Sequence, residues 1–347
     1  MMRARRKHQL GLSMIELMIS ITISLLLMAA VIQMFVGSRV TYSVQSELAK
    51  LQESARFAME FMTKDLRMTG YMGCAPSDSL LSVLDDSSLF TNAEWTQNLD
   101  FTDGGAGSGA PDPSDTITIK FADLSESCTV ESSTSTYFTC EANHNFTQGD
   151  ILIASDCSHS AVFQMSNQNN NGTVARIDHN TGTQTPGNCT KGLGAPLDCS
   201  STNGTDYSWP ENTTLIQRFR AYTYNVATNN FGQPALYRQG LTTSGGSAQL
   251  ENEELVEGVE SMQVLLGFDT DDDNVANCYS NSTASCGTGI TLDNVVALRI
   301  SLLMRSTEDN VVTDSQTYVF NGDTITATDN RLRKVFTTTV AIRNRML

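Results

Sequence analysis

The apolar residues change their period along the first part of the chain. From Leu12 to Phe35 almost every position is apolar, and only Glu16, Gln33 and small hydroxyl residues interrupt the run. A helix of this length can cross a hydrocarbon core of about 30 Å. Beyond it, apolar residues recur at three- and four-residue steps, which predicts that the helix continues in amphipathic form as far as Arg67. The residues of this amphipathic stripe are Leu48, Leu51, Ala55, Ala58, Met62 and Leu66.

Glycine and proline residues end the helix and introduce a different pattern. Gly70, Gly73 and Pro76 are stop signals, and the Ser-, Asp- and Gly-rich residues 80–115 predict a loop. Further on, apolar and polar residues alternate with period two, which predicts strands. We expect the well-patterned strands among them to face the helix, so that the fold class is α+β with a long helix packed on an antiparallel sheet. The predicted strands are residues 116–121, 151–154, 161–165, 174–178, 215–226, 262–268, 296–304 and a closing strand within 331–345.

One carboxylate lies inside the apolar run. A charged group in a bilayer-length helix costs roughly 2.5 to 3.5 kcal/mol, so Glu16 is expected to have a partner. The alternative interpretation is a plain membrane anchor in which Glu16 snorkels to the interface. Basic residues precede the helix, which predicts a cytoplasmic amino end and an exported remainder. These basic residues are Arg3, Arg5, Arg6 and Lys7.

The junction before the helix carries a second motif. Gly11 ends the basic segment, the apolar Leu12 follows it, and Glu16 is the fifth residue after Gly11. This arrangement is similar to the type IV prepilin leader, although most such proteins have Phe where this chain has Leu12. The resemblance implies that a prepilin peptidase cleaves after Gly11 and methylates the amine of Leu12. It also implies that Glu16 pairs with the amine of a neighbouring subunit during assembly.

Gly-Tyr-Met-Gly-Cys follows the helix at residues 70–74, and both this motif and the closing strand resemble the PilW family of minor pilins. The resemblance implies four parts: a leader at 1–11, a membrane and assembly half at 12–36, an amphipathic half at 37–68 and a β-rich head at 69–347. It also implies a protein of the inner membrane of a Gram-negative bacterium, with a periplasmic head, that later joins an extracellular pilus, at its tip. Membrane lipid before assembly, other minor pilins, the major pilin and a PilY-type tip adhesin would be its partners.

Two other functions stay open on the sequence. One is a J-type pseudopilin of type II secretion, which shares the leader, the helix and a sheet head. The other is an adhesive or calcium-binding tip module, in which the large middle region would bind the ligand. Whether the filament serves adhesion, twitching motility or DNA uptake is not determined by any of these residues. The net charge of −16 argues against nucleic-acid binding through the whole surface.

The cysteines indicate an oxidising compartment. All eight follow the membrane-length helix, and their even number permits complete pairing into disulfides. Sequence alone leaves many connectivities open. Proximity along the chain favours three local pairs and one distant pair, which are Cys128 with Cys140, Cys189 with Cys199, Cys278 with Cys286, and Cys74 with Cys157.

No catalytic constellation is recognisable. His8 lies in the leader, and His144, His159 and His179 lie in polar, loop-like sequence without a nucleophile elbow or metal-ligand spacing. We therefore expect no enzyme activity. A strand face with two cations and two aromatic residues is more simply a solvated face than a binding surface for a partner or polysaccharide. These four residues are Arg218, Arg220, Tyr222 and Tyr224.

An acidic loop follows the strand predicted at 262–268. Asp269, Asp271 and Asp273 have the one-three-five spacing with which carboxylates converge on calcium, the only cofactor that the sequence suggests. Two features of an EF-type loop are missing, because Asn274 replaces the turn glycine and Ser280 replaces the bidentate glutamate. A solvated acidic hairpin tip is the interpretation that such a charge run favours.

Overall fold

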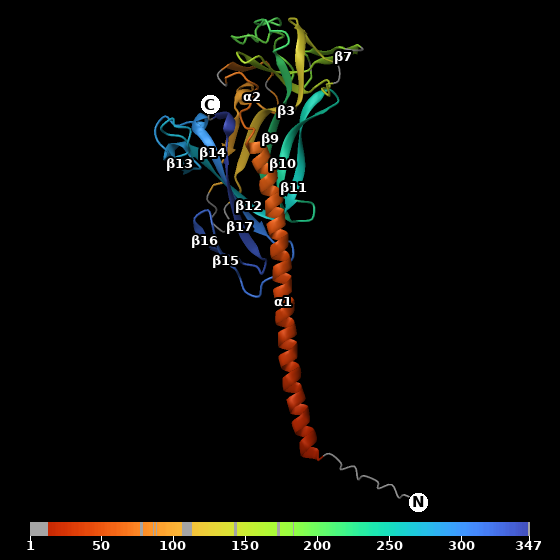
Figure 1. Cartoon of the computed structure of the whole chain (residues 1–347), viewed down its shortest axis with the longest axis vertical. Helices are drawn as coiled ribbons and strands as arrows, with labels where there is room; N and C mark the ends of the chain where they lie inside the picture. The colour runs from red at the N-terminus through yellow and green to blue at the C-terminus, as the bar shows by residue number, and fades with distance from the viewer. Residues whose placement is uncertain are drawn as a thin grey trace, which may run out of the picture.

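The computed structural model describes residues 13–345, apart from 77–78, 86, 88, 106–112, 142–143, 172–173 and 183. The leader, with Gly11 and Leu12, therefore lies outside the described residues. One long helix, α1 (Met14–Leu66), extends away from a head of β-strands that surrounds its carboxyl-terminal half (Figure 1). This architecture confirms the predicted α+β fold class.

Local chemistry defines both ends of α1. Ser13 is the N-cap: its Oγ accepts the Glu16 N–H at 3.2 Å, while the Glu16 carboxylate accepts the Ser13 N–H at 2.9 Å. This reciprocal pair is a capping box, which satisfies two backbone donors that a helix start leaves unpaired. At the other end, Gly70 adopts a φ of 77°, a conformation that favours glycine, and its N–H donates to the Lys120 carbonyl. The helix therefore ends where the glycines predict.

The strands form two sheets and a hairpin. Every pairing among the described strands is antiparallel except that of β1 with β6. The eleven-stranded sheet contains β1 (Leu80–Ser82), β2 (Leu99–Thr102), β3 (Thr116–Ser133), β4 (Tyr137–Glu141), β5 (Ile151–Ser155), β6 (Ser160–Gln164), β7 (Asn167–Asn171), β8 (Val174–Asp178), β9 (Leu215–Thr228), β10 (Pro234–Ser244) and β11 (Ser247–Glu257). The four-stranded sheet has the order β13 (Cys278–Ser280), β12 (Val259–Phe268), β14 (Val295–Arg305) and β17 (Arg333–Ala341). The hairpin is β15 (Thr317–Phe320) with β16 (Asp323–Thr326), and the short helices are α2 (Asn92–Thr96), η2 (Thr283–Ser285), η3 (Leu292–Asn294) and η4 (Arg343–Arg345).

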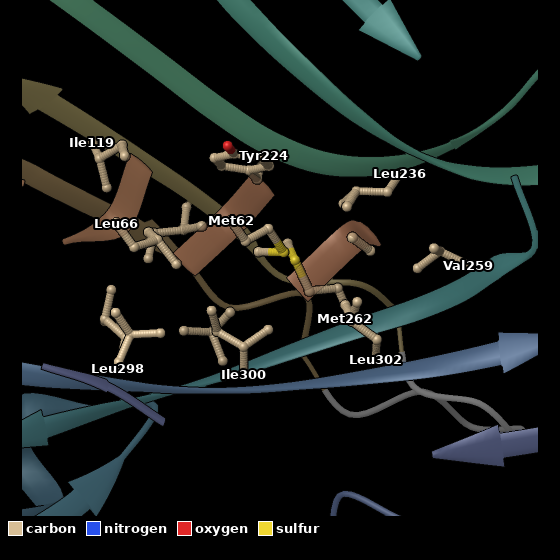
Figure 2. Close-up of a cluster of buried hydrophobic side chains, with 14 of the residues drawn as sticks. Met62, Leu66, Ile119, Tyr224, Leu236, Val259, Met262, Leu298, Ile300 and Leu302 are labelled. Atoms are coloured by element: carbon tan, nitrogen blue, oxygen red, sulfur yellow. The ribbon is translucent and has the colours of Figure 1, made fainter. Parts of the chain in front are cut away.

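The main core lies where α1 is held between the two sheets (Figure 2). Met62 and Leu66 of the helix are fully buried, with β3, β9 and β10 on one side and β12 and β14 on the other. Full burial of such side chains stabilises by about 1.5 to 3 kcal/mol each. The alternating residues predicted to face the helix do so. The sheet residues labelled in the close-up are Ile119, Tyr224, Leu236, Val259, Met262, Leu298, Ile300 and Leu302.

The four disulfides join the pairs that proximity along the chain favours. Cys128–Cys140 links β3 to β4, and Cys189–Cys199 and Cys278–Cys286 close short loops. Cys74–Cys157 is different, because it spans 83 residues and ties the segment after α1 to the turn between β5 and β6. The helix end is therefore fixed covalently to the large sheet.

The prediction of one loop over residues 80–115 is wrong for much of that segment. It contains β1, α2 and β2, and Trp95 of α2 is fully buried with its ring 5.9 Å from that of Phe219. The buried Lys120 donates to the carbonyl oxygens of Gln97, at 3.1 Å, and Glu94, which holds the end of α2 against the sheet. These elements are too short to show a period, and they are stabilised by residues far away in the sequence.

The prediction of a solvated face on β9 is also wrong. Arg218 and Arg220 both pair with Glu126, and they also pair with Asp150 and Asp123 respectively. Tyr224 on the same strand is fully buried. A bulge in β3 between Asp123 and Ser127 brings the Glu126 carboxylate to both guanidinium groups. The two arginines are thus half-buried and neutralised by carboxylates, and they do not form a free cationic surface.

Candidate assembly site

The amino-terminal half of α1 has no cover from the head. Every large apolar side chain from Met14 to Val36 is exposed, and the helix is long and apolar enough to span a bilayer. Soluble proteins rarely expose continuous apolar surface on this scale. This half of the helix is therefore suited to lipid, and equally to the apolar helices of other subunits.

Glu16 lies in the first turn of this exposed half. One carboxylate oxygen accepts the Ser13 N–H at 2.9 Å, and no described residue donates to the other oxygen. The positive end of the helix dipole favours a negative charge at this position. Glu16 is therefore positioned by its own helix and retains an oxygen that can accept a donor from outside the molecule. Gly11 and Leu12, predicted as the processing site, lie outside the described residues.

The other half of α1 is fixed to the head by a buried polar contact. Asp65 accepts a hydrogen bond from the Tyr224 hydroxyl at 2.6 Å and pairs with the Arg238 guanidinium at 2.9 Å. Burial raises the pKa of Tyr224, and the Asp65 charge adds to the rise, so the tyrosine remains a donor. At the helix end, the Asn344 amide donates to the carbonyls of Met68 and Thr69. The carboxyl-terminal half of α1 is thus held against the head by hydrogen bonds and an ion pair.

The acidic loop brings the three predicted carboxylates together. Asp269, Asp271 and Asp273 offer oxygens that all lie within 4.8 Å of one another. Burial alone would raise the pKa of Asp269, but hydrogen bonds from the backbone N–H groups of Asn274, Asp271 and Asp273 hold it below its usual range. Asn274 has a φ of 64°, so it takes the left-handed turn conformation that glycine provides in an EF-type loop. Ser280 pairs with Leu266 in the ladder of β12 and β13, so it contributes no ligand at the loop tip.

Calcium binding by this loop stays a prediction, because three carboxylates supply only part of the six to eight oxygens that calcium takes. A site of this kind is expected to bind with a dissociation constant of about 10⁻⁴ to 10⁻³ M, as extracellular calcium modules do. Asp271→Asn should then weaken binding without disturbing the loop, since Asp269 accepts the backbone hydrogen bonds and an amide oxygen at position 271 can still accept the Asn277 amide. Calorimetric titration of calcium into the wild type and the variant measures this. No calcium-dependent heat from the wild type would leave the loop a solvated hairpin tip.

The histidines have structural partners. His159 Nε2 lies 2.7 Å from the Leu193 carbonyl oxygen and His179 Nδ1 lies 2.9 Å from that of Lys191. Both residues lie in connecting segments, as predicted, but their rings are buried there. Ser158 bonds to Asp156 and Tyr207. Within the described residues, these contacts give no nucleophile and base pair.

Comparison with protein-family models gives two matches. Residues 223–344 match PilW, type IV pilus-assembly protein W, and this segment runs from within β9 to η4, including the whole four-stranded sheet. Residues 6–32 match the prokaryotic N-terminal methylation motif, which contains Gly11, Leu12 and Glu16. No curated protein and no solved structure matches the chain. The two family matches, one at each end of the chain, show that it is similar to the type IV pilus-assembly proteins of the PilW family and that it carries a prepilin-type amino-terminal motif.

Proposed function

We propose that this chain is a minor pilin that takes part in priming pilus assembly and joins the complex at the pilus tip. The observation that carries the proposal is an exposed apolar half-helix that has Glu16 in its first turn and is joined to a large head by hydrogen bonds and a disulfide. The head extends well beyond the carboxyl end of α1 (Figure 1). In a filament whose subunits stack along their helices, a head of this shape is best accommodated where no further subunit follows, which is the tip.

Glu16 provides a physical reason for assembly. Alone in lipid, the carboxylate costs roughly 2.5 to 3.5 kcal/mol, and a neighbouring amine relieves that cost. In our proposal prepilin peptidase cleaves after Gly11, so that Leu12 and the corresponding residues of neighbouring subunits present such amines. The partners would be other minor pilins, the major pilin and a PilY-type tip adhesin.

The proposed location follows the same reasoning. The basic residues before the helix favour a cytoplasmic amino end, and four disulfides suit a head that folds in the oxidising periplasm. Before assembly the subunit would be held in the inner membrane by α1. After assembly the same helix surface would be covered by its neighbours.

Deletion of the gene in its own host tests the proposal. We expect the loss of sheared surface pili with an unchanged secreted proteome, and recovery of pili when the wild-type chain is supplied. Intact pili together with lost secretion would instead assign the chain to type II secretion. Intact pili with intact secretion but lost attachment to cells or glycans would favour an adhesive module over a role in priming.

A further inference from the structure

The edge strand β17 exposes one row of backbone groups. Two hydrogen bonds beside the ladder, Ile342 N–H to the Val296 carbonyl and Ser306 N–H to the Leu332 carbonyl, are both 2.8 Å long and belong to the antiparallel register of β14 with β17. This register directs the even-numbered residues of β17 toward β14, because antiparallel strands bond through alternate residues. The odd-numbered residues direct their N–H and C=O groups away from the sheet.

Only one end of this row is closed. The Gln316 side chain accepts the Arg333 N–H at 2.8 Å and donates to the Arg333 carbonyl at 2.7 Å, as a neighbouring strand would. Among the described residues, none bonds to the outward N–H groups of Val335, Thr337 and Thr339. Val335 packs against the β15–β16 hairpin, and from Thr337 to the strand end β17 is therefore open to another strand.

The free edge of β12 is closed. On the side away from β14, the Met262 N–H donates to Ser114 Oγ at 3.1 Å and the Val264 N–H donates to Asp115 Oδ2 at 2.7 Å, while β13 pairs with the rest of the strand. The side chains of Ser114 and Asp115 thus accept the backbone hydrogen bonds that a further strand would otherwise accept. Edges of natural sheets are normally blocked in such ways.

The edge of the large sheet at β11 is blocked by charge. Glu251, Glu253 and Glu254 are exposed on it, and the register of β11 with β10 is interrupted by a bulge. The centre of β17, in contrast, is Thr337-Thr338-Thr339, uncharged and β-branched, and its register with β14 has no interruption. Such a segment readily accepts a further strand.

We propose that the outer edge of β17 binds an extended segment of a different pilin subunit, which adds to the four-stranded sheet as a fifth strand. This inference rests on the proposed function. β17 lies beside α1, since Val340 and Phe336 pack in the same core as this helix and Asn344 bonds to the helix end. A subunit whose helix packs along α1 therefore brings its own head beside β17.

The charges near β17 indicate the chemistry of the added segment. Lys334 and Arg343 are exposed at the two ends of the strand, in a chain whose net charge is −16. The segment that fits is consequently uncharged and β-branched at its centre, with acidic residues toward its ends. Backbone hydrogen bonds would provide the affinity, and the end charges would select the register.

A proline scan of β17 in the full-length chain in its host membrane tests the proposal. Thr337→Pro removes an outward N–H without loss of a backbone bond to β14, which is the place where a sheet tolerates proline. It also removes the exposed hydroxyl contact of Thr337 with Ser301 Oγ. We expect the variant to keep its membrane level and melting temperature, while copurification of partner pilins falls roughly tenfold, as for the loss of one backbone hydrogen bond worth about 1.4 kcal/mol. Thr338→Pro is the matched control, because it removes a bond to β14 and is expected to destabilise the head.

A photocrosslinking residue at Thr339 tests the proposal independently of proline, and Glu253 provides the control position on the blocked edge. We expect crosslinks from position 339 to an extended segment of another pilin, identified by mass spectrometry of the joined peptides, and none from position 253. Crosslinks to β11 of a second copy, or normal copurification of Thr337→Pro without any crosslink, would overturn the proposal. Glu16→Ala, examined in parallel, separates the two hypotheses: if it abolishes pili while β17 variants have no effect, only the β17 assignment fails.

Discussion

Glu16→Ala is expected to reduce copurification with partner pilins roughly tenfold or more, with unchanged cleavage after Gly11 and an unchanged amount of protein in the membrane. An unpaired carboxylate in lipid costs roughly 2.5 to 3.5 kcal/mol, so its pairing with a neighbour supplies free energy for association that alanine cannot supply. Cleavage should persist because Gly11 and the basic leader are intact. The measurement is affinity purification of the tagged variant from host membranes, with immunoblots for cleaved chain and partner pilins.

Two variants separate the charge of Glu16 from its role as a helix cap. Glu16→Gln retains an oxygen that can accept the Ser13 N–H but removes the charge, so it should fail almost as completely as alanine. Ser13→Ala removes the hydroxyl that accepts the Glu16 N–H and keeps the charge, at a cost of about 1 kcal/mol to the helix start. It should therefore assemble nearly normally. Wild-type copurification of Glu16→Ala would contradict the assignment, and failure of Ser13→Ala alone would mean that the helix cap matters.

Helix α1 could be predicted from the sequence because its signals are local. The apolar run, the change of period and the glycines near Gly70 fix its extent, and the charge of Glu16 is conspicuous inside the run. The helix cap at Ser13 could also have been predicted, since serine followed three residues later by glutamate is the spacing of a capping box. It was missed because Glu16 was interpreted only as a charge in the membrane. The contacts of Asp65 with Tyr224 and Arg238 could not be predicted from any local pattern, because these two residues lie about 160 to 170 residues away in the sequence.

The strands, too, were predicted correctly only where the signal is local. Those with uninterrupted alternation, such as residues 262–268, were predicted with the correct face toward α1. The face of β9 was misjudged because the neutralising Glu126 reaches Arg218 and Arg220 only through a bulge in β3, which alternation cannot reveal. Trp95 shows the same limit for the segment predicted as a loop, because its burial depends on Phe219.

We also expect a large loss of the head's folding stability at acid pH, caused by the protonation of His179. Its ring is buried between Phe138 and Phe163, with centroid distances of 5.0 and 5.7 Å, and its Nδ1 lies 2.9 Å from the Lys191 carbonyl oxygen. Burial lowers the pKa of His179 from 6.5 to about 4. The unfolded chain therefore binds a proton between these values that the folded chain does not bind. The resulting stability is complete above pH 6.5 and is lost as the pH falls toward 4, which amounts to about 3 kcal/mol.

Denaturant unfolding of the full-length chain in detergent at about pH 7.5 and about pH 4.5 measures this loss. Trp209, whose ring lies 5.9 Å from that of Phe138, reports on the cluster by fluorescence. His179→Gln should be less stable than the wild type near pH 7.5 but should lose about 2 kcal/mol less on acidification, because no buried imidazole has to be protonated.

The other titratable groups contribute equally to the pH dependence of stability in the wild type and in His179→Gln, so the difference between the two proteins reports on His179 alone. Burial raises the pKa of Asp115 to about 6. This carboxyl therefore increases the stability of the folded head as the pH falls, which is opposite in sign to the effect of the histidine. His144→Gln is the matched control, since its ring is only partly buried although burial lowers its pKa as well. If His179→Gln loses as much stability in acid as the wild type, the acid sensitivity of the head arises from its paired carboxylates, whose protonation would then account for the whole effect.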